Sequence, residues 1–237
     1  MNPINYSYRY AIDNYEKLKR YELTSQIPAI ADNDCIIIRL DGKGLTSRFK
    51  DNEHLFISDF HLAMKRVLEN IRKYCPEVLF SYSFKDEISL LINKKAINEP
   101  YQNRIEKMLP IISGYVSAMF SQFVSKKIKR IPTEAFSFDA RLIIIPKEQL
   151  KNYFHARQAF AMSGFIDRIC SFKGLSCSRS FQSVKNELRK INEDWDSYPQ
   201  YVCSGYVGFE KDGKWSVETA SDFHQRWGKY ESTIKDF

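Results

Sequence analysis

Residue patterns that form disulfides or bind zinc are missing from this chain of 237 residues. Its five cysteines are scattered without a CxxC pair, and its four histidines form neither an HxxxH nor an HxH pair. An odd number of scattered cysteines in a chain of this length favours reduced thiols over a disulfide framework. The missing pairs also argue against a zinc site and against a cluster of histidine ligands.

Long apolar runs are missing as well. No run of about 18 apolar residues occurs, so we expect no transmembrane helix and no membrane partner. The tyrosine-rich, charged N-terminus lacks the apolar region of a secretory signal, which favours a cytoplasmic location. No repeat, low-complexity segment or linker is apparent. We therefore expect a single domain over 1–237, in which residues from about 147 to 237 form a C-terminal extension of helices and a hairpin.

The chain has enough apolar material for one substantial core and an excess of positive charge. Hydrophobic residues make up 43% of it, and its formal net charge is +7, which makes an acidic partner plausible. The charge is uneven, because 147–190 carries nine bases and three acids whereas 191–237 carries five bases and nine acids. Such a basic stretch is either a solvated helix face or a surface that follows phosphates, and both readings stay open.

Hydrophobic periodicity predicts a mixed α+β protein that begins with the order strand, helix, strand, strand. Its first strand is the isoleucine run near Cys35, and two later strands around a short KDE link are typical of a hairpin. The predicted helices cover 12–25, 59–74, about 103–127 with a bend near Pro110, 147–174 and 180–191. The predicted strands cover 35–40, 75–84, 88–94 and 135–146, and a closing hairpin at 201–219 turns at Asp212-Gly213.

Acidic residues occur where two of these strands end. Asp41 closes the first strand, and Asp86 and Glu87 lie at the hairpin tip. If strands 36–41 and 80–86 lie side by side, Asp41 and Asp86 become neighbours, and they repel each other unless a cation lies between them. Mg²⁺ prefers such oxygen ligands, and two ions can hold the attacking and leaving oxygens of a phosphoryl transfer. The competing interpretation is two ordinary solvated turns.

The glycines after Asp41 fit a phosphate site. Gly42 and Gly44 have no Cβ atoms, so the loop can approach a triphosphate closely, and Gly42 can offer its carbonyl to a metal. Lys43 and Arg48 can neutralise phosphate charge.

Six short segments then occur in order along the chain. They are KLKRYE (17–22), RLDG (39–42), DE (86–87), FDARLIIIP (138–146), NYFHARQA (152–159) and KNE (185–187). In this order they resemble the motifs of the tRNA(His) guanylyltransferase family of 3′–5′ polymerases, and more closely its bacterial and archaeal guanylyltransferase-like branch. No single motif is decisive, but six in order are a strong resemblance.

The resemblance implies a palm fold like that of DNA polymerases and nucleotidyl cyclases, with a ferredoxin-like β-α-β-β core. It implies a tetramer and two Mg²⁺ ions held by Asp41, the Gly42 carbonyl and Asp86, with Glu87 as a further catalytic or supporting acid. It also implies that ATP or GTP activates the 5′ phosphate of a tRNA, after which the 3′-hydroxyl of an incoming nucleoside triphosphate attacks that end.

Two further groups of residues follow from the resemblance and the local chemistry. We expect nucleotide contacts from Arg39, Lys43, Gly44, Leu45, Thr46, Ser47 and Lys85. We expect RNA or phosphate contacts from Arg157, Lys185, Asn186, Lys151, Lys173 and Arg189, although a structural ion pair of Arg157 and a solvated Lys185 are competing interpretations.

Three positions depart from the family pattern. MSGF occupies 162–165 where the family has HINN, Lys85 replaces a serine before the acidic pair, and a histidine is replaced near Thr46. These departures favour templated 5′-end repair on a broader set of tRNAs over guanylate addition to tRNA(His) alone. Two other classes stay open, namely a palm-fold enzyme that makes nucleotides without RNA and a non-catalytic RNA-binding module.

Overall fold

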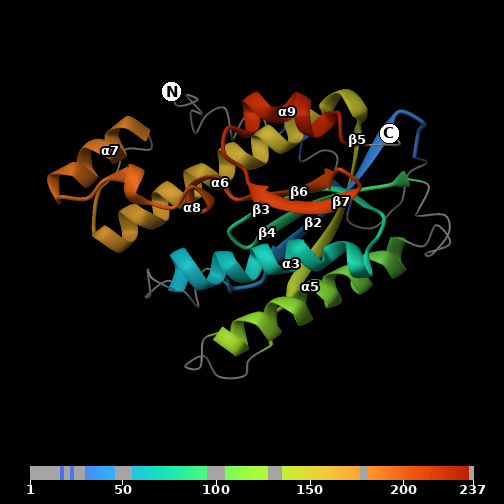
Figure 1. Cartoon of the computed structure of the whole chain (residues 1–237), viewed down its shortest axis with the longest axis horizontal. Helices are drawn as coiled ribbons and strands as arrows, with labels where there is room; N and C mark the ends of the chain where they lie inside the picture. Colours follow the sequence, from blue (N-terminus) through green and yellow to red (C-terminus); the bar gives the residue numbers. More distant parts are fainter. Residues whose placement is uncertain are drawn as a thin grey trace.

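A single antiparallel sheet organises the chain (Figure 1). The computed structural model describes residues 17–18, 22–23, 30–45, 55–94, 105–127, 135–176 and 181–234. The seven strands lie in the order β1-β5-β2-β4-β3-β6-β7, and β1 contributes two residues at the edge. Their bounds are β1 Glu22–Leu23, β2 Asp34–Gly42, β3 Val78–Phe84, β4 Glu87–Ile92, β5 Phe138–Pro146, β6 Tyr206–Lys211 and β7 Lys214–Thr219.

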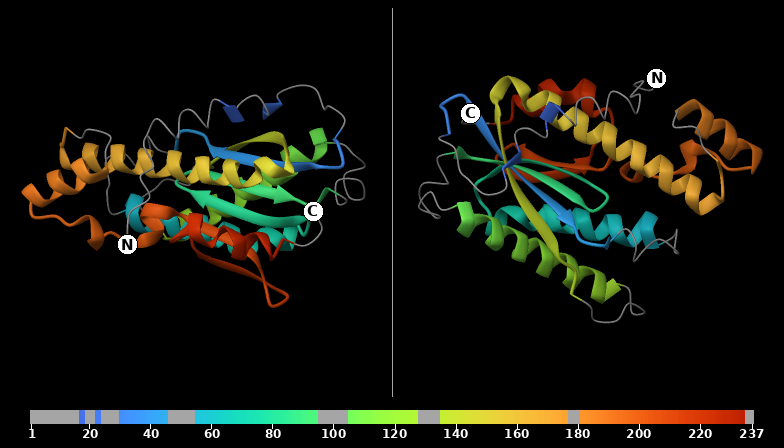
Figure 2. Two further views of the ribbon diagram at one scale, coloured as in Figure 1. Left: turned by 90° about the horizontal axis from the view of Figure 1, so that it is seen from above. Right: turned by 180° about the vertical axis from the view of Figure 1, so that it is seen from behind.

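Helices cover both faces of the sheet (Figures 1 and 2). On one face lie α3 (His61–Tyr74) and α5 (Ile105–Lys127), and on the other lie α6 (Leu150–Lys173) and α9 (Phe223–Glu231). The far end of α6 extends beyond the sheet, where α7 (Phe181–Lys190) and α8 (Gln200–Ser204) lie against it. Short helical turns occupy Leu55–Phe60, Lys147–Gln149 and Trp195–Ser197.

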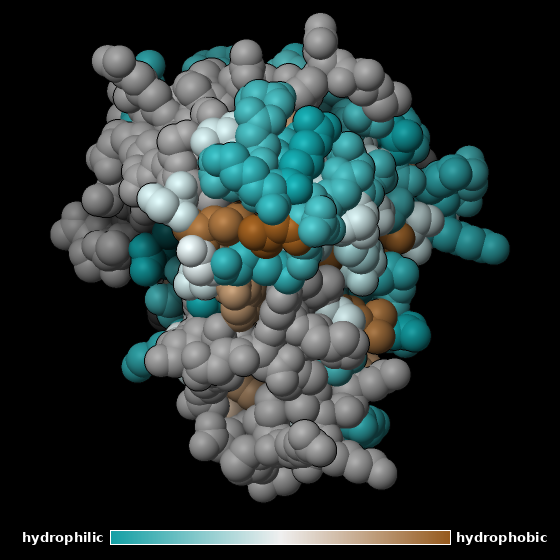
Figure 3. Space-filling model, turned by 90° about the vertical axis from the view of Figure 1, so that its left-hand side faces the viewer, coloured by the Kyte–Doolittle hydropathy of each residue, from teal (hydrophilic) through white to brown (hydrophobic). Residues whose placement is uncertain are grey.

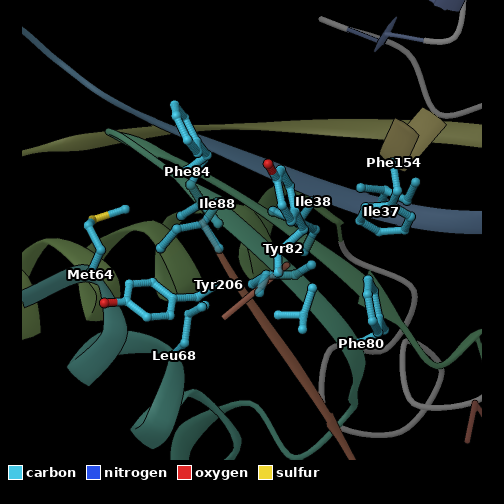
Figure 4. Close-up of a cluster of buried hydrophobic side chains, with 14 of the residues drawn as sticks. Ile37, Ile38, Met64, Leu68, Phe80, Tyr82, Phe84, Ile88, Phe154 and Tyr206 are labelled. Atoms are coloured by element: carbon cyan, nitrogen blue, oxygen red, sulfur yellow. The ribbon is translucent and has the colours of Figure 1, made fainter. Parts of the chain in front are cut away.

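The strand β2 is buried because it lies inside the sheet with helices over both faces. Ile36, Ile37 and Ile38 have no exposed surface, which is why this strand appears in the sequence as a continuous apolar run. Figure 4 shows Ile37 and Ile38 among side chains from β3, α3 and α6. On the α6 side, the ring of Phe80 lies 4.9 Å from that of Phe154, in an edge-on contact.

The helix α5 packs one apolar stripe onto the protein. Its segment Lys107–Lys126 is long and apolar enough to cross a membrane. One such helix is weak evidence of a membrane span, because core helices of water-soluble proteins share this property. The α5 helix contacts β5 and α3 along one stripe, and 28% of the segment Lys107–Lys126 is buried. Its buried residues recur every three or four positions and are Ile105, Met108, Ile112, Val116, Phe120 and Val124.

Most of the predicted elements are confirmed, and the closing hairpin forms, but it begins at Tyr206 and not at 201, because Gln200–Ser204 forms α8. The hairpin's turn residues Asp212 and Gly213 both have positive φ, at 51° and 74°, as the tightest hairpin turns require. The predicted helix 12–25 lies mostly outside the described residues, and within it Glu22–Leu23 is a strand paired with β5. Pairing with the sheet edge has overridden the local helical pattern there.

One predicted neighbour relationship is wrong. The strands 36–41 and 80–86 were expected side by side, but β4 lies between β2 and β3 and pairs with both. The crossover through α3 leaves β2 and β3 parallel with a gap one strand wide, and the hairpin folds β4 back into that gap.

The expectation of reduced thiols throughout is also wrong at one position. Cys170 on α6 is disulfide-bonded, and its partner lies outside the described residues. Cys35, Cys75 and Cys203 are free, so the described part of the chain holds both kinds of cysteine.

Candidate active site

Three acidic residues line up across the middle of the sheet. Asp41 is the second-last residue of β2, and it lies in register with Glu87 on β4 and with Asp139 on β5. Asp86 precedes Glu87 in the β3–β4 turn, and its carbonyl oxygen accepts a hydrogen bond of 2.8 Å from the amide of Gly42. The insertion of β4 therefore still brings Asp41 and Asp86 together, although the predicted strand order was wrong.

The position of Gly42 has no room for a side chain. A Cβ atom there would lie 2.2 Å from Cδ1 of Leu45 and 3.0 Å from Cβ of Asp86. Leu45 itself has no exposed surface, so its side chain belongs to the core beneath the turn. The glycine thus allows the end of β2 to lie directly against the β3–β4 turn.

The acidic residues open into a cavity of about 370 Å³ between the sheet and α6. Its wall mixes three carboxylates with four cations, which is the composition expected where metal ions and phosphates meet. The residues that line it are Arg39, Asp41, Phe84, Lys85, Asp86, Glu87, Arg141, Arg157, Phe160, Ala161 and Gly164.

The surroundings of the Asp41 carboxyl group disfavour its ionised form. Its pKa is raised to about 6, first by burial and then by the negative charges of Asp86, Glu87 and Asp139, against which Arg39 acts weakly. In this position the carboxyl group either takes up a proton, which neutralises it, or stays ionised with a cation nearby.

This charge pattern fits magnesium. Asp41 and Asp86 offer hard oxygen atoms, and Mg²⁺ takes most of its remaining ligands from water and phosphates. Within the described residues, no group of three or more histidine, cysteine or acidic side chains could hold a metal ion. A metal at this site therefore depends on two carboxylates, a backbone carbonyl such as that of Gly42, and non-protein oxygens.

Glu87 is held by an arginine from α6. Nε of Arg157 donates to Oε1 of Glu87 over 2.7 Å, and a terminal nitrogen of the same guanidinium donates to Oε2. Both side chains are largely buried, and the guanidinium also lies 5.1 Å from the ring centre of Phe160. This two-bonded geometry matches the structural ion pair that was one of the interpretations of Arg157.

The remaining predicted nucleotide contacts fall into three groups. Arg39 and Lys85 line the cavity, and burial lowers the pKa of Lys85 to about 8. Lys43 and Gly44 are exposed in the turn after β2, where Gly44 has a positive φ of 68°. Thr46, Ser47 and Arg48 lie outside the described residues.

The predicted RNA contacts lie on α6 and α7, away from the cavity except for Arg157. Lys173 pairs with Glu193 at 2.7 Å, and Lys185 pairs with Asp196 at 3.0 Å. Lys151, Asn186 and Arg189 are exposed. Within the described part of the chain, the charges of Lys151 and Arg189 are therefore available to a partner, whereas those of the two paired lysines are partly used.

Four residues of the site were missed in the sequence. Asp139 and Arg141 stand in the FDAR segment, and they form an exposed ion pair of 3.5 Å beside Asp41. The matching position of two acids on paired strands was the signal for Asp139. Phe160 and Gly164 lie one helix turn apart on α6. Phe160 belongs to none of the motifs, and Gly164 was noted only as part of the MSGF segment that replaces HINN.

Comparisons with known proteins show which protein family the chain resembles. The family model described as tRNAHis guanylyltransferase matches residues 15–146. The tRNA(His) guanylyltransferase of Debaryomyces hansenii is 25% identical over 62% of this chain and 56% of its own length. A probable tRNA(His) guanylyltransferase of Drosophila melanogaster is 28% identical over 63% of this chain and 51% of its own length. The chain thus spans about half the length of these curated relatives.

Solved structures show the same fold. A bacterial tRNA(His) guanylyltransferase-like protein in complex with ATP matches with a TM-score of 0.72 and 20% identity, over 98% of this chain and all of that one. The tRNA(His) guanylyltransferase of Saccharomyces cerevisiae matches with a TM-score of 0.65 and 15% identity, over 82% and 92% of the two chains. The predicted palm-like fold is confirmed.

Proposed function

This chain belongs to the tRNAHis guanylyltransferase family, and we propose that it is a magnesium-dependent nucleotidyltransferase that extends the 5′ end of tRNA. The observation that carries this proposal is the placement of Asp41 against Asp86 and Glu87 at the mouth of one cavity. The raised pKa of Asp41 supports it, because a site that gathers negative charge is prepared for cations.

The reaction follows from the family. ATP or GTP first activates the 5′ phosphate of the RNA, and the 3′-hydroxyl of an incoming nucleoside triphosphate then displaces the activating group. Bacterial guanylyltransferase-like proteins have been solved in complex with ATP and in complex with GTP, which supports both nucleotides as substrates here.

Asp41, Asp86 and the carbonyl of Gly42 would hold two Mg²⁺ ions. When bound, these ions supply charge stabilisation for the reacting phosphates. Glu87 acts from a position fixed by Arg157, so we assign it the role of orienting the acidic cluster. Lys43 and Gly44 approach the triphosphate from the turn after β2, where the glycine lets the backbone come close.

The tRNA lies along α6 and α7 in this proposal. The described part of the end that carries α7 is largely hydrophilic, with a narrow hydrophobic strip across it (Figure 3). Lys151 and Arg189 supply exposed positive charge on these two helices. A cytoplasmic location and a homotetramer belong to the same proposal, because both agree with the family resemblance.

A direct experiment tests the proposed function. The protein is incubated with Mg²⁺, labelled ATP and GTP, and a tRNA transcript that lacks its 5′ nucleotide, and the RNA is resolved by length. Extension by one or more nucleotides supports the proposal. Nucleotide turnover without RNA extension would instead favour a palm-fold enzyme that acts on nucleotides alone. RNA binding without turnover would favour the non-catalytic module.

A further inference from the structure

The backbone of Lys85 has an unusual, left-handed conformation. Lys85 lies in the turn between β3 and β4, immediately before Asp86, and its φ is 49°. Residues other than glycine rarely adopt this left-handed backbone, and they keep it when the surrounding structure fixes it. Here the turn is fixed by the two paired strands and by the bond between Gly42 and Asp86.

From this turn, the side chain of Lys85 reaches a helix that has left space for it. A Cβ atom on Gly164 of α6 would lie 2.5 Å from Nζ of Lys85 and 3.5 Å from its Cε. A side chain at 164 would therefore displace the ammonium group from its present position. Gly164 differs in this from the helical glycines Gly114 and Gly228, whose Cβ positions meet nothing within 4 Å.

The ammonium faces the cavity, and no partner for it occurs among the described residues. Lys85 and Gly164 both line the cavity beside Asp41 and Asp86. Within the described residues, Lys85 forms no hydrogen bond and no ion pair of 4 Å or less, although Asp86, Asp167 and Arg168 act on it electrostatically. A cation that is packed in place next to a site for phosphates is arranged to bind an anion.

We propose that Lys85 and Gly164 form a phosphate subsite, in which the Lys85 ammonium binds a phosphate group of a 5′-nucleotide. This inference rests on the proposed function for the identity of the cavity's substrates. The two residues depart from the family motif together, as a lysine in place of a serine and a glycine within the segment that replaces HINN. The two residues act together, since the ammonium group of Lys85 lies in the space that the missing side chain of Gly164 leaves.

A neighbouring aromatic ring indicates why the ligand is a nucleotide and not a bare anion. Phe160 lies one helix turn before Gly164 in the same cavity, and 40% of its surface is exposed. An exposed aromatic ring in the cavity that holds the ammonium offers a surface on which a base can stack. The phosphate can belong to a free nucleoside triphosphate or to the 5′ end of an RNA.

The test measures binding without turnover. Dissociation constants for GTP, tripolyphosphate and guanosine are determined by calorimetry with wild-type protein and with Lys85→Met, which keeps the length of the side chain and removes its charge. We expect GTP and tripolyphosphate to bind about tenfold more weakly to the variant, with guanosine unchanged. A tRNA with a 5′-triphosphate and the same tRNA with a 5′-hydroxyl form the second arm.

The two arms distinguish the source of the phosphate. A loss confined to GTP and tripolyphosphate assigns the subsite to the free nucleotide. A loss confined to the 5′-phosphorylated tRNA assigns it to the RNA end. Equal weakening of guanosine and GTP would show a structural role and overturn the proposal.

A second variant tests the pairing of the two residues. Gly164→Ala places a Cβ on the ammonium, so we expect the same loss of phosphate binding, and the double variant with Lys85→Met should lose no more than either one. Gly114→Ala on α5 is the matched control, because nothing lies within 4 Å of its Cβ. Normal phosphate binding by Gly164→Ala, or additive losses, would contradict the pairing.

Failure of the phosphate subsite can be distinguished from failure of the proposed function. Wild-type protein that binds neither phosphorylated ligand overturns both proposals. Wild-type protein that extends tRNA, together with a Lys85→Met variant of unchanged affinity for every ligand, overturns the phosphate subsite alone.

Discussion

The amide nitrogen of Gly42 donates a hydrogen bond of 2.8 Å to the carbonyl oxygen of Asp86. This bond continues the pairing of β2 with β4 by one residue, from Asp41 and Glu87 to Gly42 and the β3–β4 turn. It sets the distance between Asp41 and Asp86 through backbone atoms, before either carboxylate meets a ligand. The geometry of the acidic site therefore depends on how closely Gly42 can approach Asp86.

Replacing Gly42 by alanine tests this dependence. The new Cβ would lie 2.2 Å from Leu45 and 3.0 Å from Asp86, so the buried leucine or the turn must shift. Overpacking of this kind costs about 1–3 kcal/mol of unfolding free energy. We expect a lower melting temperature and at least a tenfold lower rate of nucleotidyl transfer. Gly228→Ala on α9 is the control, because its Cβ meets nothing within 4 Å. Its transfer rate should stay near wild type, and its melting temperature should not fall, since alanine favours a helix over glycine.

The charge of Asp41 should oppose folding while it supports catalysis. Its pKa rises from 3.8 to about 6 on folding, so the folded state binds the extra proton between these values. The destabilisation is present above pH 6 and disappears as the pH falls below 3.8. At pH 7 without divalent ions, Asp41→Asn should therefore raise the unfolding free energy, by about 1–2 kcal/mol after allowance for partial exposure.

The same variant reports on the metal. Mg²⁺ should raise the melting temperature of the wild-type protein but not that of Asp41→Asn, and transfer should fall to background. A variant that is less stable than wild type, or one that keeps its magnesium response, would remove the case for a cation between Asp41 and Asp86.

A histidine pair between α6 and α9 should make the fold sensitive to acid. His155 is buried, and its Nδ1 lies 2.9 Å from Nδ1 of His224. Burial first, and then the second ring, lowers the pKa of His155 to about 3 from 6.5. The unfolded chain binds the proton below pH 6.5 and the folded chain does not, so stability falls as the pH decreases from about 6.5 toward 3.

Urea unfolding at pH 7, 6 and 5 measures this contribution. Between pH 7 and 5, His155 should lower the unfolding free energy by about 2 kcal/mol. His155→Gln should show a flatter pH dependence over this interval. His224→Gln should keep most of the slope, because burial is the larger cause of the shift. An identical slope for His155→Gln and wild type would assign the acid sensitivity to other groups.

The sequence predicts this site well where local patterns decide the structure. The isoleucine run before Asp41 and the DE pair in a short hairpin link each mark a strand end, and the strands form as expected. The insertion of β4 between β2 and β3 was missed, because a strand order depends on the handedness of a crossover and not on periodicity.

Contacts between distant segments were the other information that the sequence did not provide. The fit between Lys85 and Gly164 joins a turn to a helix 79 positions later, and each residue alone appears only as a lost motif. The disulfide of Cys170 is likewise invisible in a scattered set of cysteines without a CxxC spacing. The fit of Lys85 against Gly164 follows from the packing of α6 onto the sheet, which no local pattern encodes.

Binding of RNA along α6 and α7 should depend steeply on salt. Lys151 and Arg189 are exposed, whereas Lys173 and Lys185 are engaged by Glu193 and Asp196. Each lost phosphate contact should reduce the slope of log affinity against log salt by roughly 0.7–0.9.

Fluorescence anisotropy with labelled tRNA across a salt series measures that slope. Lys151→Ala with Arg189→Ala should lower it by about 1.4–1.8 and leave ATP affinity unchanged. Lys211→Ala with Lys214→Ala, in the exposed turn between β6 and β7, is the control and should leave the slope unchanged. Equal slopes for all three proteins would make the basic stretch a solvated face.

The identity of the added nucleotide follows from what the site lacks. MSGF replaces HINN at 162–165, and the family histidine near Thr46 is replaced as well. These departures favour templated addition in our proposal. Selection then falls to base pairing, because a Watson–Crick pair with the opposite strand places the 3′-hydroxyl of the incoming nucleotide against the activated 5′ end. Correct placement alone can supply much of the barrier reduction. Four truncated tRNAs, each with a different base opposite the missing position, should therefore receive four different nucleotides, as read by sequencing of the product. Guanosine added to all four would restore an untemplated, tRNA(His)-type reaction, and it would mean that residues other than the missing motif recognise the guanine base.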